Sequence, residues 1–296
     1  MRLSLPRVLS PGPLFPTMQL SAVGDLESRP VSWLWPGRLA LGKLAMLDGD
    51  PGPGKSLVTL DLCARLSKGR SFPDGATSPE RGAALVLNGE DSAEDTIRPR
   101  LQALGADLKR VFVLRPEDMS SSEPLQLPKH TNVLDDALTE TRARLLVIDP
   151  IAAFLDPRIQ SSNDASVRRA LAPLAQLAQQ HGAAVILVRH LNKSPGRSPI
   201  YRGGGSIGFL AACRSGWLIA RDPEQPAHCV LAQVKNNLAP PQPSLAYQVE
   251  KSESKIVSLS WLGPTEWTAA QLLAGVPRNP PRRLTPREQA REFLEG

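Results

Sequence analysis

The sequence is poor in the features that stabilise secreted or membrane proteins. Its three cysteines, Cys63, Cys213 and Cys229, are odd in number and far apart, which fits neither a disulfide framework nor a zinc site with closely spaced ligands. Four prolines interrupt the first 16 residues, so this stretch does not fit a signal peptide. No segment is long and apolar enough to span a bilayer. We therefore expect a protein of the reducing cytoplasm with no membrane partner.

Aromatic side chains are also scarce, and acidic residues are fewer than basic ones. Phe, Trp and Tyr make up 4% of the chain, which argues against an aromatic-rich platform for stacking nucleic-acid bases. The formal net charge of +6 favours polyanionic partners, although a basic composition alone does not establish that nucleic acid is bound. With 296 residues, 41% of them hydrophobic, the chain has enough apolar material for one large α/β core.

Apolar runs alternate with amphipathic stretches, as expected for strands and helices around a buried parallel sheet. The expected strands are 43–48, 83–88, 110–114, 145–149 and 183–189, and the expected helices are 56–67, 93–104, 132–142 and 164–181. Later runs separated by turn-rich segments predict antiparallel strands at 216–221, 229–234, 245–250 and 256–261. This pattern indicates a doubly wound α/β core that antiparallel strands extend.

Three regions follow from this pattern. Residues 1–30, punctuated by Pro and Gly, predict an extended arm, and residues 31–262 predict one large α/β domain. Residues 263–296 predict a linker and the start of a helical segment, because a capping box begins at Thr285. That helix either opens a further domain that is truncated here or docks as a terminal helix, and the sequence leaves both alternatives open.

The most specific motif in the chain is a complete G-x-x-x-x-G-K-[ST] phosphate loop. It is formed by Gly49-Asp50-Pro51-Gly52-Pro53-Gly54-Lys55-Ser56, and the predicted nucleotide-binding set ends with Leu57. Such a loop binds ATP because its backbone amides surround phosphate oxygens, its Lys reaches the β- and γ-phosphates and its Ser binds Mg²⁺. An apolar run precedes the loop and a helix follows it, so the helix N-terminus adds positive charge. A glycine-rich turn without a ligand is the alternative.

Pro53 departs from what this loop requires. It has no amide hydrogen, and it stands just before Gly54, where such loops often donate to phosphate. We therefore expect weaker nucleotide affinity than with Leu at this position.

Two acidic residues are candidates for metal binding and catalysis. Asp149 ends an apolar strand in the Walker B form, and we expect it to hold Mg²⁺ together with Ser56. Glu90 follows another strand and is the candidate general base that activates water. The alternative is that Glu90 and Asp91 only begin a helix, where acidic side chains suit the helix dipole.

His190 ends the strand expected at 183–189. A polar residue at this position is expected to contact the γ-phosphate and to report its loss to the loop that follows. An ordinary strand-end histidine is the alternative.

Several of these features occur together in an order that resembles a known family. They are Glu90-Asp91, the strand ending in Asp149, His190-Leu191-Asn192-Lys193, Arg202-Gly203-Gly204-Gly205-Ser206, Arg214 and Lys235-Asn236-Asn237. The chain resembles the RepA-like ATPases of plasmids and phages, hexameric replicative helicases of the RecA/DnaB group. The resemblance covers roughly residues 31–261. It implies a RecA-like P-loop NTPase core and a hexameric ring with ATP bound between neighbouring subunits.

The resemblance also implies roles for individual residues. Arg214 corresponds to an arginine finger that reaches the next subunit's γ-phosphate, and Lys235 to a second contact of this kind. Asn237 stands where related helicases often carry Arg, which puts the identity of the finger in doubt. The loop at 191–208 corresponds to one that grips single-stranded DNA, with a solvated, flexible loop as the alternative. Its candidate nucleic-acid contacts are Lys193, Arg197, Tyr201 and Arg202.

The sequence thus predicts an ATP-hydrolysing motor that uses ATP and Mg²⁺ on single-stranded DNA, such as a plasmid- or phage-type helicase or translocase. One alternative is a RadA-like recombination ATPase, which forms filaments on DNA without unwinding it. Another is a KaiC-like regulatory ATPase without nucleic acid. The sequence contains no second phosphate loop, which argues against a duplicated KaiC-like chain.

Overall fold

The computed structural model describes residues 20–77, 80–115, 123–191, 207–251 and 256–274, in two units. The described part of the first unit, Met1–Val31, contains the short 3-10 helix Val23–Asp25, which buries no side chain. The second unit, Ser32–Gly296, contains the sheet and the helices that pack on it. No helix within the described ranges is long and apolar enough to cross a membrane.

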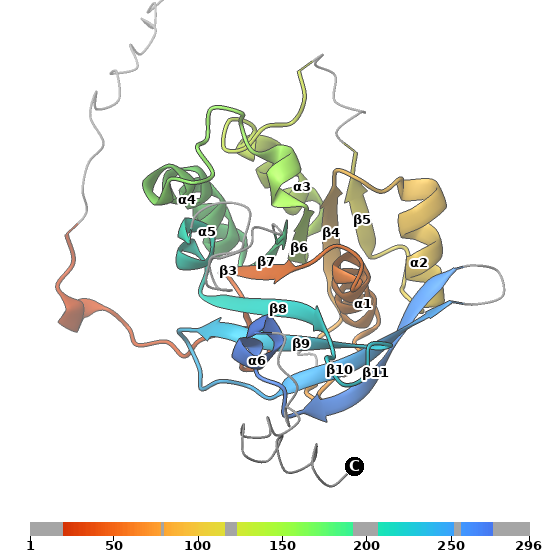
Figure 1. Ribbon diagram of the computed structural model, residues 1–296. Coiled ribbons are helices and arrows are strands. Elements are labelled where there is room, and N and C mark those ends of the chain that lie inside the picture. Colours follow the sequence, from red (N-terminus) through yellow and green to blue (C-terminus); the bar gives the residue numbers. More distant parts are fainter. Residues whose placement is uncertain (1–19, 78–79, 116–122, 192–206, 252–255, 275–296) are drawn as a thin grey trace, which may run out of the picture. The chain divides into compact units, whose positions relative to one another are not determined.

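A nine-stranded sheet forms the centre of the described part of the second unit, with the order β11-β10-β9-β8-β3-β7-β6-β4-β5 (Figure 1). The strands from β8 to β5 in this order run parallel, and β9, β10 and β11 add antiparallel pairs at one side. The parallel strands are β3 (Leu44–Gly49), β4 (Ala83–Asn88), β5 (Val111–Leu114), β6 (Ala143–Asp149), β7 (Ala184–His190) and β8 (Ser215–Arg221). The antiparallel strands are β9 (His228–Asn236), β10 (Ser244–Lys251) and β11 (Val257–Thr265). A separate two-stranded sheet pairs β1 (Trp33–Trp35) with β2 (Leu39–Ala40).

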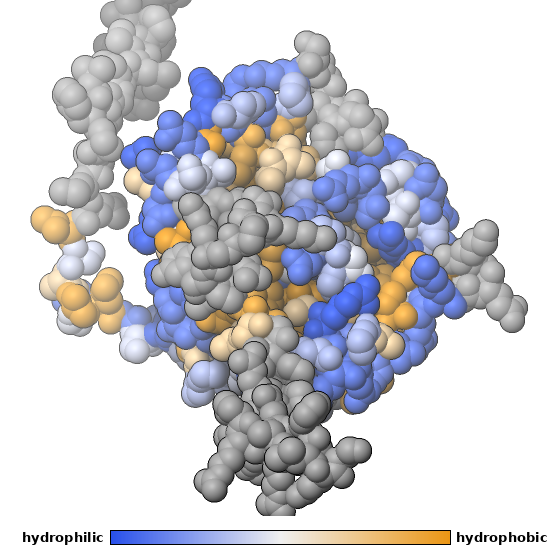
Figure 2. All heavy atoms as spheres, viewed as in Figure 1, coloured by the Kyte–Doolittle hydropathy of each residue, from blue (hydrophilic) through white to orange (hydrophobic). Residues whose placement is uncertain are grey.

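Helices cover both faces of the large sheet, which explains why its central strands are apolar throughout (Figure 1). On one face lie α1 (Lys55–Lys68) and α2 (Arg98–Ala103). On the other face lie α3 (Thr131–Thr141), α4 (Asp164–His181) and α5 (Gly208–Ala212). The short 3-10 helix Ile151–Phe154 follows β6, and α6 (Ala269–Ala274) packs against β8 and β9. Hydrophilic residues cover most of the described surface on the side that Figure 2 shows.

The α/β fold class predicted from the sequence is confirmed, with a mostly parallel sheet extended by C-terminal antiparallel strands. The predicted strands and helices are present with small shifts at their ends. One difference is the stretch predicted as a single helix at 93–104, which begins with a π-helical turn at Ala93–Ile97. Pro99 follows this turn and has no N–H to bond one turn back, which favours a local change of hydrogen-bond pattern.

The C-terminal strands also run further than predicted. β11 continues to Thr265, beyond the predicted domain end at residue 262, because its pairing with β10 resumes after a bulge at Ala246/Tyr247. Pro264 is compatible with this edge strand. The helix start predicted at Thr285 lies outside the described residues.

Candidate active site

Four parallel strands end together at one edge of the sheet. Gly49 is in register with His190, and Asn88 with Asp149. Side chains along a strand alternate between the two faces of the sheet. By this alternation the four positions share a face with the apolar strand residues that pack under α1. The strand ends therefore present Asp149 and His190 on the face of the sheet where α1 begins.

The phosphate loop joins β3 to α1 in a conformation that requires glycine. A Cβ on Gly49 would lie 2.5 Å from the carbonyl oxygen of Ile219 in the neighbouring strand, so no larger residue fits there. Gly52 and Gly54 have φ angles of 100° and 93°, which side chains disfavour. The glycines of the motif thus allow the turn of the loop and the close approach of the Ile219 backbone.

A buried ammonium and a carboxylate face each other at the start of α1. Lys55 Nζ donates to the carbonyls of Gly49 (2.9 Å) and Asp50 (2.8 Å), and burial lowers its pKa while Asp149 opposes that shift. The Ser56 hydroxyl hydrogen bonds to Asp149, whose pKa is raised mainly by burial. Oxygen ligands of this kind suit Mg²⁺, and the buried ammonium suits a phosphate. The residues present therefore fit ATP with Mg²⁺.

A cavity of about 350 Å³ opens beside this loop. The loop and the start of α1 form one side, with the predicted catalytic residues Glu90 and His190 next to them. The C-terminal hairpin of β10 and β11 forms another side, which the sequence did not predict. The lining residues that no motif identified are Arg100, Val249, Lys251 and Val257.

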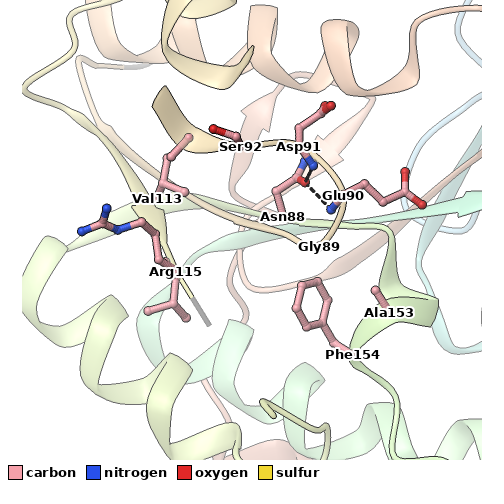
Figure 3. Close-up of a pocket in the computed structure, with 11 residues that line it drawn as sticks. Asn88, Gly89, Glu90, Asp91, Ser92, Val113, Arg115, Ala153 and Phe154 are labelled. Atoms are coloured by element: carbon pink, nitrogen blue, oxygen red, sulfur yellow. Dashed lines mark hydrogen bonds between the residues drawn. The ribbon is translucent and has the colours of Figure 1, made fainter. Parts of the chain in front are cut away.

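Glu90 projects from a tight turn after β4. Asn88 Oδ1 accepts hydrogen bonds from the backbone N–H groups of Glu90 (2.8 Å) and Asp91 (2.7 Å), and the Glu90 side chain extends away from this turn (Figure 3). Its side chain is 58% exposed, with one carboxylate oxygen 3.7 Å from His190 Nε2, whereas Asp91 pairs with Arg100 at 2.9 Å. Glu90 thus presents a largely exposed carboxylate, next to His190, to the cavity, whereas Asp91 forms an ion pair with Arg100.

His190 keeps hydrogen-bonding capacity. Its Nδ1 atom is buried and has no hydrogen-bond partner among the described residues. The side chain as a whole is 38% exposed and lines the cavity, so the exposed part of the ring can hydrogen bond with a group that enters it, as a phosphate sensor requires.

A second cavity, of about 330 Å³, lies on the other side of the Asn88–Asp91 turn (Figure 3). Phe154, from the short helix after β6, and Arg115, after β5, line it together with the turn. A Cβ on Gly89 would lie 2.8 Å from Ala153 Cβ, so this turn is closely packed against the segment after the Walker B strand.

Arg214 and Lys235 lie at the opposite end of the sheet. The Arg214 N–H donates to the carbonyl of Leu44 at the start of β3, about 16 Å from the phosphate loop by the rise of a strand. Lys235 Nζ donates to three backbone carbonyls at the end of α5: Leu210 (2.9 Å), Ala211 (3.4 Å) and Cys213 (2.8 Å). Neither residue reaches the phosphate loop of its own chain, and a contact with a neighbouring subunit stays a prediction for both.

The candidate nucleic-acid contacts are not part of this geometry. Lys193, Arg197, Tyr201 and Arg202 lie outside the described residues.

A buried ion pair behind the phosphate loop was missed by the sequence analysis. Arg189 bonds both carboxylate oxygens of Asp48 at 2.8 Å, and their side chains are only 5% and 11% exposed. The guanidinium also lies 5.0 Å from the centre of the Phe209 ring on α5. The only signal in the sequence was a charge of each sign at the end of two apolar strands. The pair links β3, which leads into the phosphate loop, to β7, which ends at His190.

Comparison with known proteins gives a family and a set of relatives. A family model described as an AAA domain matches residues 14–196. The DNA repair protein RadA of Halalkalibacterium halodurans is 28% identical over 171 residues, which are 57% of this chain and 32% of that protein. For RadA of Streptococcus pneumoniae the identity is 28% over 159 residues, covering 53% and 32%. For RadA of Bacillus subtilis it is 27% over 159 residues, covering 53% and 30%. The match spans about a third of the length of these curated relatives.

Proposed function

We propose that this chain, which belongs to the AAA domain family, hydrolyses ATP and couples the hydrolysis to DNA. The fold and the family make it a P-loop ATPase of the RecA-like type. The observation that carries the proposal is the meeting of five side chains at one edge of the sheet, around one cavity and the buried Asp149 beside it. They are Lys55, Ser56, Glu90, Asp149 and His190.

Each of these residues has a part in phosphoryl transfer. Ser56 and Asp149 would hold Mg²⁺, which when bound neutralises charge on the β- and γ-phosphate oxygens. Lys55 would leave its two loop carbonyls for those oxygens. Glu90 would accept a proton from the water whose oxygen bonds to the γ-phosphorus as ADP leaves. His190 would hydrogen bond to the γ-phosphate and lose that contact when phosphate departs.

The proposal of DNA as the partner rests on the relatives and on charge. The relatives are named as DNA repair proteins, and the formal net charge of +6 suits a phosphate backbone. The four predicted DNA contacts, from Lys193 to Arg202, follow β7 directly in the chain. His190 is the last residue of β7, so a shift of His190 on loss of phosphate would also shift the start of the proposed DNA-binding segment.

The resemblance of Arg214 to an arginine finger supports an assembly as the working form. An arginine at the far end of β3 from its own phosphate loop can stabilise phosphoryl transfer only on another copy of the chain. This supports a ring, in which case a helicase or translocase is the second candidate function. It equally supports a filament, as in the RadA-like alternative.

The test is the rate of ATP hydrolysis with and without single-stranded DNA, with duplex DNA and single-stranded RNA as comparison polymers. We expect single-stranded DNA to raise the rate several-fold. Strand displacement on a forked duplex then separates the candidates, because a helicase displaces the strand and a recombination ATPase does not. A rate that no nucleic acid changes would contradict the DNA partner and favour a KaiC-like switch.

A further inference from the structure

The C-terminal hairpin of β10 and β11 contacts the phosphate loop and the helix that follows it. Tyr247, on β10, donates a hydrogen bond from its hydroxyl to the carbonyl oxygen of Pro53 at 2.7 Å, although the two residues are 194 positions apart. Two residues further along β10, Val249 Cγ2 would lie 3.3 Å from a Cβ on Gly54. Trp261, on β11, donates from Nε1 to Asp61 Oδ2 on α1 at 2.8 Å. The hairpin therefore holds both the loop and the helix that follows it.

The hydrogen bond to Pro53 fixes the direction of one amide. The C=O of Pro53 and the N–H of Gly54 belong to the same peptide plane, and the bond is not among the cis peptides of the described chain. In a trans peptide these two groups point in opposite directions. A carbonyl held toward the buried Tyr247 hydroxyl therefore turns the Gly54 N–H away from the core, on the side where Gly54 lines the cavity.

Tyr247 is well suited to hold this carbonyl. Its side chain is 0% exposed, and its ring packs on Trp261 with centroids 5.2 Å apart. Cys229 lies opposite it on the neighbouring strand β9. Burial raises the pKa of Tyr247 well above its usual range, so the hydroxyl keeps its proton and remains a donor.

We propose that Tyr247 is a positioning residue for ATP binding, which orients the Gly54 N–H toward the phosphates. This inference rests on the proposed function. It also bears on Pro53, which has no N–H and so leaves the loop with one hydrogen-bond donor fewer for the phosphates. With that donor missing, the loop depends more on the neighbouring amide, and Tyr247 fixes it in advance.

The test is the substitution Tyr247→Phe, which removes one hydroxyl and leaves the ring in place. We expect the Kd of a non-hydrolysable ATP analogue to rise about tenfold, as for one lost hydrogen bond to a charged group. The KM for ATP should rise with it, while kcat at saturating ATP stays within about twofold, because the reacting groups are untouched. Asp61→Asn is the matched control, since it weakens the hydrogen bond from the same hairpin to α1 and leaves the rings of Tyr247 and Trp261 in place, and it should leave the Kd nearly unchanged.

A second arm uses Pro53→Leu, which restores a donor to the loop. In this background Tyr247→Phe should raise the Kd by less than in the wild type, because another amide shares the phosphate. An unchanged Kd in a folded Tyr247→Phe variant overturns the inference and leaves the proposed ATPase standing. An equal rise in Asp61→Asn overturns it too, because the hairpin then acts only through its general attachment to α1. Failure of the wild-type chain to bind nucleotide overturns both the inference and the proposed function.

Discussion

Replacing Glu90 with Gln is expected to lower ATP turnover by at least about 100-fold while nucleotide affinity stays within about twofold. Glutamine keeps the size of the side chain but cannot accept the proton of the attacking water. The Glu90 side chain is more than half exposed and its 3.7 Å contact with His190 is long, so its charge contributes little to the fold. The measurement is single-turnover hydrolysis at saturating ATP, combined with an equilibrium titration of nucleotide.

Asp91→Asn is the matched control for this prediction. The side chain of Asp91, next to Glu90, pairs with Arg100 and its backbone N–H holds the turn, so Asp91→Asn should weaken the ion pair, keep the turn and leave most of the turnover. If Glu90→Gln retains wild-type turnover, Glu90 is not the base, and the alternative that it only begins the helix gains support. A large loss in both variants would instead indicate that the turn, rather than one carboxylate, is needed.

Replacing Arg189 with Met is expected to lower the free energy of unfolding by about 3–5 kcal/mol. The change leaves the Asp48 carboxylate buried without its bidentate partner, and it removes the contact of the guanidinium with Phe209. Both charged residues stand in register at the ends of β3 and β7, so no solvent-facing rearrangement relieves the burial. Denaturant unfolding followed by circular dichroism measures the difference.

The double variant Asp48→Leu/Arg189→Met separates the cost of the unpaired charge from that of altered packing. Because both charges are gone, most of the lost stability should return. A single Arg189→Met variant within about 1 kcal/mol of the wild type would show that the pair is not an energetic link between the two strands.

The fold could be predicted because its signals are local. The buried strands are unbroken apolar runs, such as the one that ends at Asp149, and the helix Asp164–His181 has both its periodicity and a capping Asn163 in the sequence. Residues that act at the ends of parallel strands could be located for the same reason. Carboxyl ends of such strands share one edge of the sheet, so Asp149 and His190 had to lie near the phosphate loop.

The rest of the site depends on contacts that no local pattern contains. The pairing of Asp48 with Arg189 requires β3 and β7 to be neighbours in one register, although 141 positions separate the residues. Tyr247 reaches Pro53 only because the antiparallel hairpin folds back beside α1, and alternating strand patterns do not say where a hairpin packs. Arg100 likewise could not be identified from the sequence, because only the position of the helix after Glu90 brings it to the cavity.

The most direct test of the account is a titration of an ATP analogue with Mg²⁺ onto the wild-type chain and onto Lys55→Ala. Lys55 is the buried cation of the phosphate loop, and no other residue of the loop can replace its charge. We predict saturable, Mg²⁺-dependent binding to the wild type and a loss of at least about 100-fold in affinity in the variant. Equal affinities, or no binding to a folded wild-type chain, would contradict the assignment of ATP to this loop.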